Sequence, residues 1–130
     1  MNMNNSRPAA RRILVVDDNR DAARTLALLL KVKGYESHEC YSGEQALATA
    51  ERLRPQAILL DISMPGLDGY QTCQLLRQQP WGSQLLVIAL SGYGSEEDQR
   101  RSLEAGFDMH LVKPVDLMGL LEVLETASNP

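Results

Sequence analysis

Five short apolar runs alternate along this chain with five stretches of helical periodicity, and this alternation limits the fold more than any other feature. Short apolar runs bounded by turn-forming residues are typical of buried strands, and apolar residues spaced three and four apart are typical of helices with one buried face. Parallel strands joined by helices cross over with one hand and become covered on both faces. The sequence therefore predicts an α/β fold, a single doubly wound (βα)5 domain with helices on both faces of a five-stranded parallel sheet.

The predicted strands are 12–16, 35–41, 57–61, 85–90 and 108–112, and the predicted helices are 19–34, 42–54, 67–79, 95–106 and a last one striped by Leu117, Leu120, Leu121 and Leu124. The second strand is the most polar, because it carries Glu36, His38 and Glu39. A polar strand suits the edge of a sheet, where one side meets water. The apolar first strand then lies inside the sheet, and the predicted strand order is 2-1-3-4-5.

Three helix ends carry local signals. Gly34 fits the left-handed position that follows the first helix. Ser42 and Gln45 fit a capping box, in which each side chain accepts a hydrogen bond from the other residue's backbone amide. Ser95 is followed by three acidic residues, which would complement the dipole of a helix that begins there.

Charge and hydropathy exclude several classes of protein. The net charge of −4 and a pI near 5.1 argue against a nucleic-acid partner, which needs a basic surface. Apolar runs are too short to span a bilayer, and the first ten residues hold no apolar stretch of a secretory signal, so we expect no membrane partner and a cytoplasmic domain.

We expect this domain to cover 11–127, after a disordered lead-in at 1–10 and before a tail at 128–130. Cys40 and Cys73 lack metal-ligand spacing and are interpreted as small buried hydrophobes.

An acidic cluster is predicted where the first and third strands end. The stretch 57–69 closes an apolar run with Asp61, and a proline and two glycines then turn the chain away. In the predicted order these two strands are neighbours, so Asp17 and Asp18 converge with Asp61 on the rim where open α/β sheets bind ligands. Carboxylates about 5 Å apart repel by roughly 3 kcal/mol at an effective dielectric near 20, so such a cluster implies either a cation that neutralises it or a shared proton. Hard oxygen ligands favour Mg²⁺, and a solvated acidic rim is the alternative.

The fourth and fifth strands end at Ser91 and Lys113. Considered singly, these are an ordinary turn serine and an ordinary surface lysine. Together with a metal-bound carboxylate, however, a hydroxyl and an ammonium form a site shaped for a phosphoryl group. The chemistry implied is attack by a carboxylate on phosphorus, which gives an aspartyl phosphate.

Four motifs at strand ends carry a resemblance to a known family: VVDDN at 15–19, LDISMPGLDG at 60–69, ALSG at 89–92 and VKP at 112–114. They resemble the receiver domain of two-component response regulators, the CheY-like superfamily, over residues 11 to about 126. The resemblance implies that Asp61 is the phosphoacceptor, Ser91 the switch hydroxyl and Lys113 the phosphate partner. It also implies a Mg²⁺ site, with Mn²⁺ as a substitute, and a cis peptide between Lys113 and Pro114. The implied ligands are Asp17, Asp18, Asp61 and the main-chain carbonyl of Ser63.

The chain departs from the family at His110, where an aromatic residue usually couples phosphorylation to output. We expect His110 to weaken or redirect this coupling, and a surface histidine without a switching role is the alternative. Ser63 and Tyr93 occupy positions that tune hydrolysis of the acyl phosphate in the family. Tyr93 as a plain surface-loop aromatic also stays open.

The resemblance further implies a partner histidine kinase or histidine phosphotransfer protein that docks on the first helix and on the loop after the fifth strand. It also implies a phosphorylation-dependent dimer through helix 4, strand 5 and helix 5. The chain would catalyse only its own phosphorylation and slow autodephosphorylation, so it is not expected to be an enzyme. Segments 94–98 and 106–116 look most like receivers associated with hybrid sensor kinases, and a stand-alone receiver and an excised domain both stay open.

Two other functions are weighed against this interpretation. A haloacid-dehalogenase-like phosphatase also forms an aspartyl phosphate at a strand end, but it needs a second aspartate two residues later, where this chain has Ser63. A phosphorylation-independent pseudo-receiver usually loses part of the acidic cluster, whereas this chain keeps all of it. The phosphoacceptor is therefore preferred.

Overall fold

The structure, a computed structural model, describes residues 11–64 and 66–127. The predicted lead-in at 1–10, the tail at 128–130 and Pro65 lie outside the described residues. The strands are β1 (Arg12–Val16), β2 (Glu36–Cys40), β3 (Ala57–Asp61), β4 (Leu86–Ser91) and β5 (Met109–Val112). The helices are α1 (Arg20–Val32), α2 (Gly43–Leu53), α3 (Gly69–Arg77), α4 (Glu96–Ala105), α5 (Leu117–Ala127) and the short 3₁₀ turn η2 (Gly82–Gln84).

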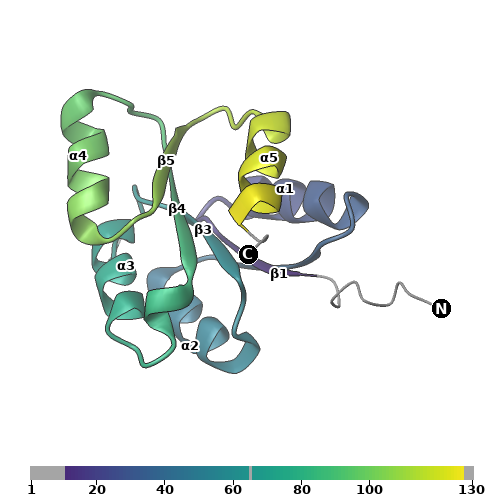
Figure 1. The fold of residues 1–130 in the computed structure, drawn as a ribbon, viewed down its shortest axis with the longest axis horizontal. Helices are drawn as coiled ribbons and strands as arrows, with labels where there is room; N and C mark the ends of the chain where they lie inside the picture. Colours follow the sequence, from purple (N-terminus) through teal and green to yellow (C-terminus); the bar gives the residue numbers. More distant parts are fainter. Residues whose placement is uncertain (1–10, 65, 128–130) are drawn as a thin grey trace.

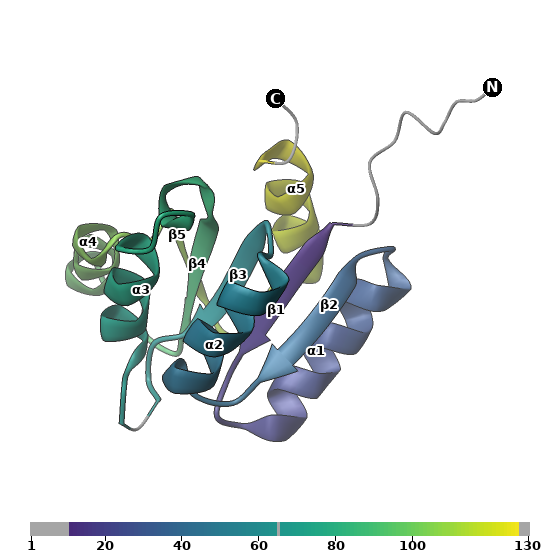
Figure 2. The same cartoon turned by 90° about the horizontal axis from the view of Figure 1, so that it is seen from below.

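All five strands are parallel, and their order is β2-β1-β3-β4-β5, which confirms the predicted topology. The helices form a layer on each face of the sheet (Figure 1): α1 and α5 cover one face, and α2, α3 and α4 cover the other (Figure 2). Among the described residues, no helix is both long enough and apolar enough to cross a membrane.

Two separate cores follow from the alternation of side chains along each strand. In β1, Leu14 and Val16 pack into the core under α2 and α3, whereas Ile13 and Val15 pack into the core under α1 and α5. All five residues of β3 are buried, as expected for a central strand covered on both faces. The polar β2 lies at the edge, where Glu36, His38 and Glu39 are only half-buried.

The helix ends mostly follow the local signals. Gly34 has a φ of +99°, which confirms its left-handed position after α1. Ser42 accepts a hydrogen bond from the amide of Gln45 at 3.1 Å, but the predicted reciprocal bond is wrong. The side-chain oxygen of Gln45 reaches one residue further and accepts from the amide of Tyr41 at 2.8 Å. Ser95 begins α4 with a complete capping box, which confirms the predicted start.

The boundaries of α3 and β4 differ from the predicted ones by one or two residues. Helix α3 begins after Asp68, because this side chain and Gln71 form a capping box that the sequence analysis missed. The same helix ends at Arg77 rather than at residue 79, since the residue before Pro80 is disfavoured in a helical conformation. Strand β4 includes Ser91 rather than Leu85, because Ser91 still pairs with Val112 of β5.

Arg77 closes the end of the sheet opposite the acidic cluster. Its guanidinium donates to the carbonyls of Gly106, Gly82 and Leu85 at 2.8–2.9 Å and to the carboxylate of Asp108 at 2.7 Å. These bonds join the end of α3 to η2, to the start of β4 and to the loop before β5. One side chain thus holds four segments at the end where no functional residue was predicted.

Candidate functional site

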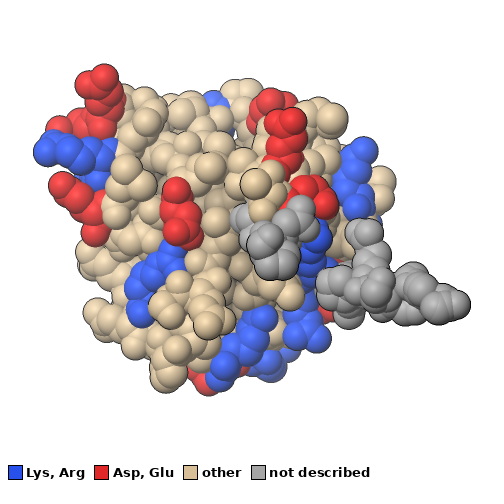
Figure 3. Space-filling view, viewed as in Figure 1, with Lys and Arg blue, Asp and Glu red and all other residues tan. Residues whose placement is uncertain are grey.

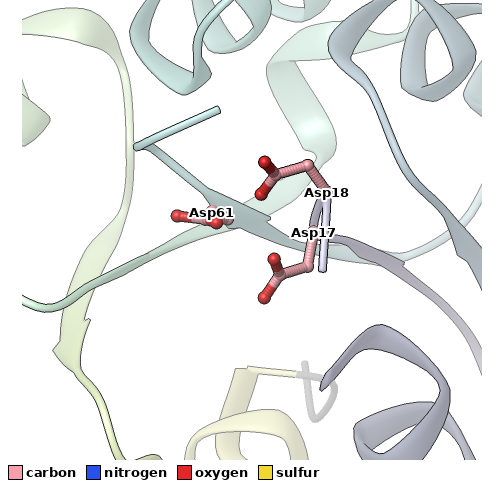
Figure 4. A group of neighbouring side chains, drawn as sticks. All are labelled: Asp17, Asp18 and Asp61. Carbon is pink, nitrogen blue, oxygen red and sulfur yellow. The ribbon is translucent and has the colours of Figure 1, made fainter. Parts of the chain in front are cut away.

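The acidic cluster lies at the carboxyl ends of β1 and β3. These strands pair in register with Val16 opposite Leu60, so the residues that follow, Asp17 and Asp61, become neighbours. One carboxylate oxygen from each of Asp17, Asp18 and Asp61 lies within 4.8 Å of the others (Figure 4). Asp17 and Asp61 are each only 4% exposed, whereas Asp18 is exposed. The structure thus brings the adjacent Asp17 and Asp18 together with Asp61, which is far from them in the sequence.

Backbone amides hold two of these carboxylates in place. Oδ1 of Asp17 accepts a hydrogen bond from the amide of Asn19 at 3.0 Å, and Oδ1 of Asp61 accepts one from the amide of Ser63 at 3.0 Å. Such bonds to the amide two residues on are favourable in turns, and they fix the orientation of each carboxylate. The second oxygen of each, Oδ2, faces the ammonium of Lys113.

Lys113 supplies an ammonium to the cluster from the residue after β5. Its Nζ lies 3.2 Å from Oδ2 of Asp17 and 3.5 Å from Oδ2 of Asp61. Burial by itself lowers the pKa of Lys113, but the carboxylates of Asp61 and Asp17 outweigh it, and the net shift is upward. The lysine is therefore charged at neutral pH, and three carboxylates with one ammonium leave the cluster at −2 when all are ionised.

The pKa of Asp61 is raised, chiefly because burial disfavours its charged form. The amide of Ser63 lowers the pKa, the neighbouring Asp17 raises it, and Lys113 lowers it. Burial makes the largest contribution to this upward shift, and Lys113 is one of the two groups that oppose it. An all-oxygen donor set with excess negative charge fits a hard divalent cation such as Mg²⁺.

Ser91 occupies the strand end between Asp61 and Lys113. It is buried, its carbonyl accepts from the amide of Lys113 at 2.7 Å, and its Oγ accepts from the amide of Tyr93 at 2.9 Å. The Ser91 hydroxyl also carries a hydrogen that it can donate. The peptide between Lys113 and Pro114 is cis, as the resemblance implied.

The remaining predicted residues, Ser63, Tyr93 and His110, lie outside the group of three carboxylates. Ser63 is exposed in the loop after β3, and the side chain of Tyr93 is 71% exposed in the loop after β4. His110 is half-buried on β5, where both ring nitrogens have partners: Ser102 Oγ at 2.8 Å from Nδ1 and Tyr93 O at 2.9 Å from Nε2. His110 is thus held by two partners, which an unengaged surface histidine would lack.

Two residues beside the site were missed by the sequence analysis. Asn19 caps α1 by accepting from the amide of Ala22, and its own amide orients Asp17. Ser102 is a buried hydroxyl on the face of α4 that also buries Ala105, and this polar residue at a buried helical spacing was the available signal.

A groove of about 500 Å³ lies next to the cluster, between α1 and the loop after β5. It is lined by Asp17 and Lys113 from the cluster and by apolar residues that include Leu26, Leu29 and Val115. Leu29 is exposed. The groove therefore joins the charged rim to an apolar surface of α1.

The two cysteines do not belong to the site. Both are free and buried, and burial raises the pKa of Cys40 to about 12 and that of Cys73 to about 11. Neither thiol is a nucleophile at neutral pH.

Comparisons with known proteins agree with this geometry. A family model of the response regulator receiver domain matches residues 13–125. The chain is 41% identical over 110 residues to the transcriptional regulatory protein PrrA of Mycobacterium leprae, which covers 85% of this chain but only 46% of PrrA. Its structure is similar to that of chemotaxis protein CheY4 of Vibrio cholerae, with a TM-score of 0.86 and 28% identity over 92% of this chain and 99% of the other. It is also similar to the receiver domain of a signal transduction histidine kinase from Syntrophus aciditrophicus, with a TM-score of 0.82 and 32% identity over 91% and 89% of the two chains.

Proposed function

This chain belongs to the response regulator receiver domain family of two-component signalling, and from that premise we propose that Asp61 accepts a phosphoryl group from the phosphohistidine of a partner protein. The observation that supports this most directly is the cluster of Asp17, Asp18 and Asp61 with Lys113 on one rim of the sheet. Receiver domains are in general signal transducers rather than enzymes. The reaction proposed for this chain accordingly modifies the chain itself.

In the proposed transfer, a carboxylate oxygen of Asp61 attacks phosphorus and forms an O–P bond. The P–N bond of the phosphohistidine breaks, and its electron pair stays on the imidazole, which takes up a proton. Lys113 neutralises one phosphoryl oxygen, and the Ser91 hydroxyl donates a hydrogen bond to another while its oxygen continues to accept from Tyr93. Hydrolysis of the acyl phosphate later returns Asp61 to its carboxylate and releases inorganic phosphate.

Receiver domains bind Mg²⁺ in an acidic pocket, and we propose Asp17, Asp18, Asp61 and the main-chain carbonyl of Ser63 as the protein ligands. When bound, the cation neutralises phosphoryl charge that Lys113 alone does not balance. The exposed side chain of Asp18 leaves one side of the cluster open to solvent, where a phosphodonor can approach.

Ser63 and Tyr93 are proposed to control access of the hydrolytic water, because each lies two residues after a residue of the site. The Tyr93 ring is long enough to shield the acyl phosphate if it turns from solvent toward the rim. The variant Tyr93→Ala should then lose its phosphoryl group several-fold faster, as followed by intact mass over time. An unchanged rate would remove Tyr93 from this role.

The groove between α1 and the loop after β5 is the proposed docking site for a histidine kinase or phosphotransfer protein. Its apolar lining and its position beside Lys113 suit a partner helix that carries the phosphohistidine. Leu29→Asp should slow transfer from a phosphorylated phosphotransfer protein and leave labelling by acetyl phosphate unchanged. Equal slowing of both reactions would contradict docking at this groove.

A second surface is proposed for contact with another copy of the chain after phosphorylation. Leu103, Val112 and Met118 are exposed on α4, β5 and α5, three elements that follow one another across the face seen in Figure 1. On that face a broad uncharged area lies between the charges over α4 and those over α5 (Figure 3). Light scattering before and after phosphorylation tests whether the mass doubles.

Incubation with acetyl phosphate and Mg²⁺, followed by intact mass, tests the central proposal. We expect one addition of about 80 Da, the mass of one HPO₃ group. The addition should be absent from Asp61→Asn and from samples with EDTA, and present in Asp21→Asn, which removes an exposed carboxylate outside the cluster. Absence of any addition to the unmodified chain would refute the phosphoacceptor and favour a phosphorylation-independent binding module.

A further inference from the structure

A continuous line of hydrogen bonds runs from the phosphoacceptor site into α4. The amide of Tyr93 donates to Oγ of Ser91 at 2.9 Å, and the carbonyl of the same residue lies 2.9 Å from Nε2 of His110. On the other side of the ring, Nδ1 lies 2.8 Å from Oγ of Ser102. Two buried hydroxyls, one in the site and one in α4, are thereby joined through one backbone residue and one imidazole.

The chemistry of these partners determines the tautomer of His110. A carbonyl oxygen can only accept, so Nε2 must carry the proton that is donated to Tyr93. In the neutral ring Nδ1 is then an acceptor, and the Ser102 hydroxyl donates to it. Ser102 is 0% exposed, and no buried side-chain polar atom among the described residues lacks a partner. If the ring turned outward, the bonds to both Ser102 and Tyr93 would be lost together.

The loop after β4 is also seated against β5 by close packing. A Cβ atom added to Gly94 would collide with Cγ2 of Val112, two residues after His110 on the same strand. A side chain at position 94 would force the Val112 side chain to move, so glycine lets the loop pack this closely against β5. The position of Tyr93 is therefore set twice, by the imidazole and by the contact at Gly94.

We propose that His110 is a positioning residue of the phosphoacceptor site, which fixes the Ser91 hydroxyl through the backbone of Tyr93 and ties it to Ser102 inside α4. This inference rests on the proposed function of Asp61. In this role the ring does not swing freely. It stays bonded on both sides, and a change at Ser91 reaches α4 as a change in the hydrogen bonds of the imidazole.

The role is tested by three variants that leave every residue of the proposed site in place. His110→Leu removes both ring nitrogens at similar volume, Ser102→Ala removes the anchor in α4, and Gly94→Ala pushes the loop from β5. Each should slow phosphorylation by acetyl phosphate by roughly 3- to 10-fold, since misplacing a hydrogen-bond donor at a reacting group is costly. His110→Gln keeps a donor and an acceptor on one planar group and should recover at least half of the rate. Glu104→Ala, an exposed change on the same helix, should leave the rate unaltered.

A spectroscopic readout separates positioning from a general loss of structure. Nitrogen NMR of the full chain should show His110 as the single tautomer protonated at Nε2, and a mixture of tautomers in Ser102→Ala. Both ring nitrogens of the unmodified chain should shift on phosphorylation, and these shifts should shrink at least threefold in Ser102→Ala.

Two results would overturn the proposal: mixed tautomers in the unmodified chain, or rates in His110→Leu and Ser102→Ala within 1.5-fold of normal. Failure of the proposed function looks different, because no variant and no parent chain would then gain mass. In that case two measurements still test whether the His110 imidazole holds the loop after β4. They are the tautomer of His110 and the amide hydrogen exchange of residues 92–95 in Ser102→Ala. If the amides of 92–95 exchange as slowly in Ser102→Ala as in the unmodified chain, the imidazole does not hold the loop and the proposal is refuted.

Discussion

Neutralising Asp61 should stabilise the metal-free domain, although the change removes its proposed phosphoacceptor. Three carboxylates lie within 4.8 Å of one another, and the one ammonium among them lies 3.5 Å from Asp61. Removing one negative charge from this site therefore removes two repulsions and only one close attraction. Asp61→Asn keeps the shape of the side chain and an oxygen that can accept from the amide of Ser63.

The size of the effect follows from Coulomb's law at an effective dielectric near 20. Each neighbouring carboxylate repels Asp61 by at least about 3.5 kcal/mol, and Lys113 attracts it by about 4.7 kcal/mol. The net repulsion is about 2 kcal/mol, and solvent around the exposed Asp18 and the partly exposed Lys113 reduces it to about 1–2 kcal/mol. A gain of this size should raise the melting temperature by about 3–10 °C.

The pH dependence has a definite sign. Because the pKa of Asp61 is raised in the folded protein, the folded state binds its proton more tightly than the unfolded state does. The unmodified domain then loses stability as pH rises from the unfolded value through the raised folded pKa, whereas Asp61→Asn does not. The difference between the two proteins should grow over that range and level off above the folded pKa.

Thermal unfolding in EDTA at pH 4 to 8 measures this difference, with Asp21→Asn as the control for an exposed carboxylate outside the cluster. Addition of Mg²⁺ should then stabilise the unmodified domain more than Asp61→Asn, because the variant lacks one proposed ligand. A variant less stable than the parent at pH 7 in EDTA, or a difference that does not change with pH, would refute the electrostatic reasoning.

Three further substitutions test the fold. Arg77→Met should lower the free energy of unfolding by about 3 kcal/mol in urea titrations, because it leaves three backbone carbonyls and Asp108 without their guanidinium partner; a loss below 1 kcal/mol would contradict this role. Gly69→Ala should destabilise by at least about 2 kcal/mol, since the added Cβ would meet backbone atoms at the end of β3, and an unchanged midpoint would show that this turn can relax. Burial and the hydrogen bond to Glu125 raise the pKa of Tyr35 above 10.0, so stability should fall as pH rises through that folded value, and Tyr35→Phe should remove this dependence when unfolding is followed at alkaline pH.

The sequence by itself determined the architecture and the convergence of the charged residues at one rim. Strand β3 shows why: a short apolar run between turn formers has few alternatives to burial in a parallel sheet, and its last residue must then reach the carboxyl edge. The polar residues of β2 likewise predicted that this strand lies at the edge of the sheet. Once strand order is known, Asp17 and Asp61 are neighbours by register, and no detail of side-chain packing is needed.

Only the tertiary structure decided the partners of residues whose hydrogen bonds cross between elements. His110 could be recognised as unusual, but its bonds to Tyr93 and Ser102 depend on how closely α4 and the loop after β4 approach β5. The side chain of Gln45 likewise accepts from the amide of Tyr41, whereas the capping box predicted the amide of Ser42 as its partner. Hydrophobic periodicity is a property of a local segment and averages over many residues, whereas a hydrogen bond is gained or lost within less than 1 Å of packing between elements.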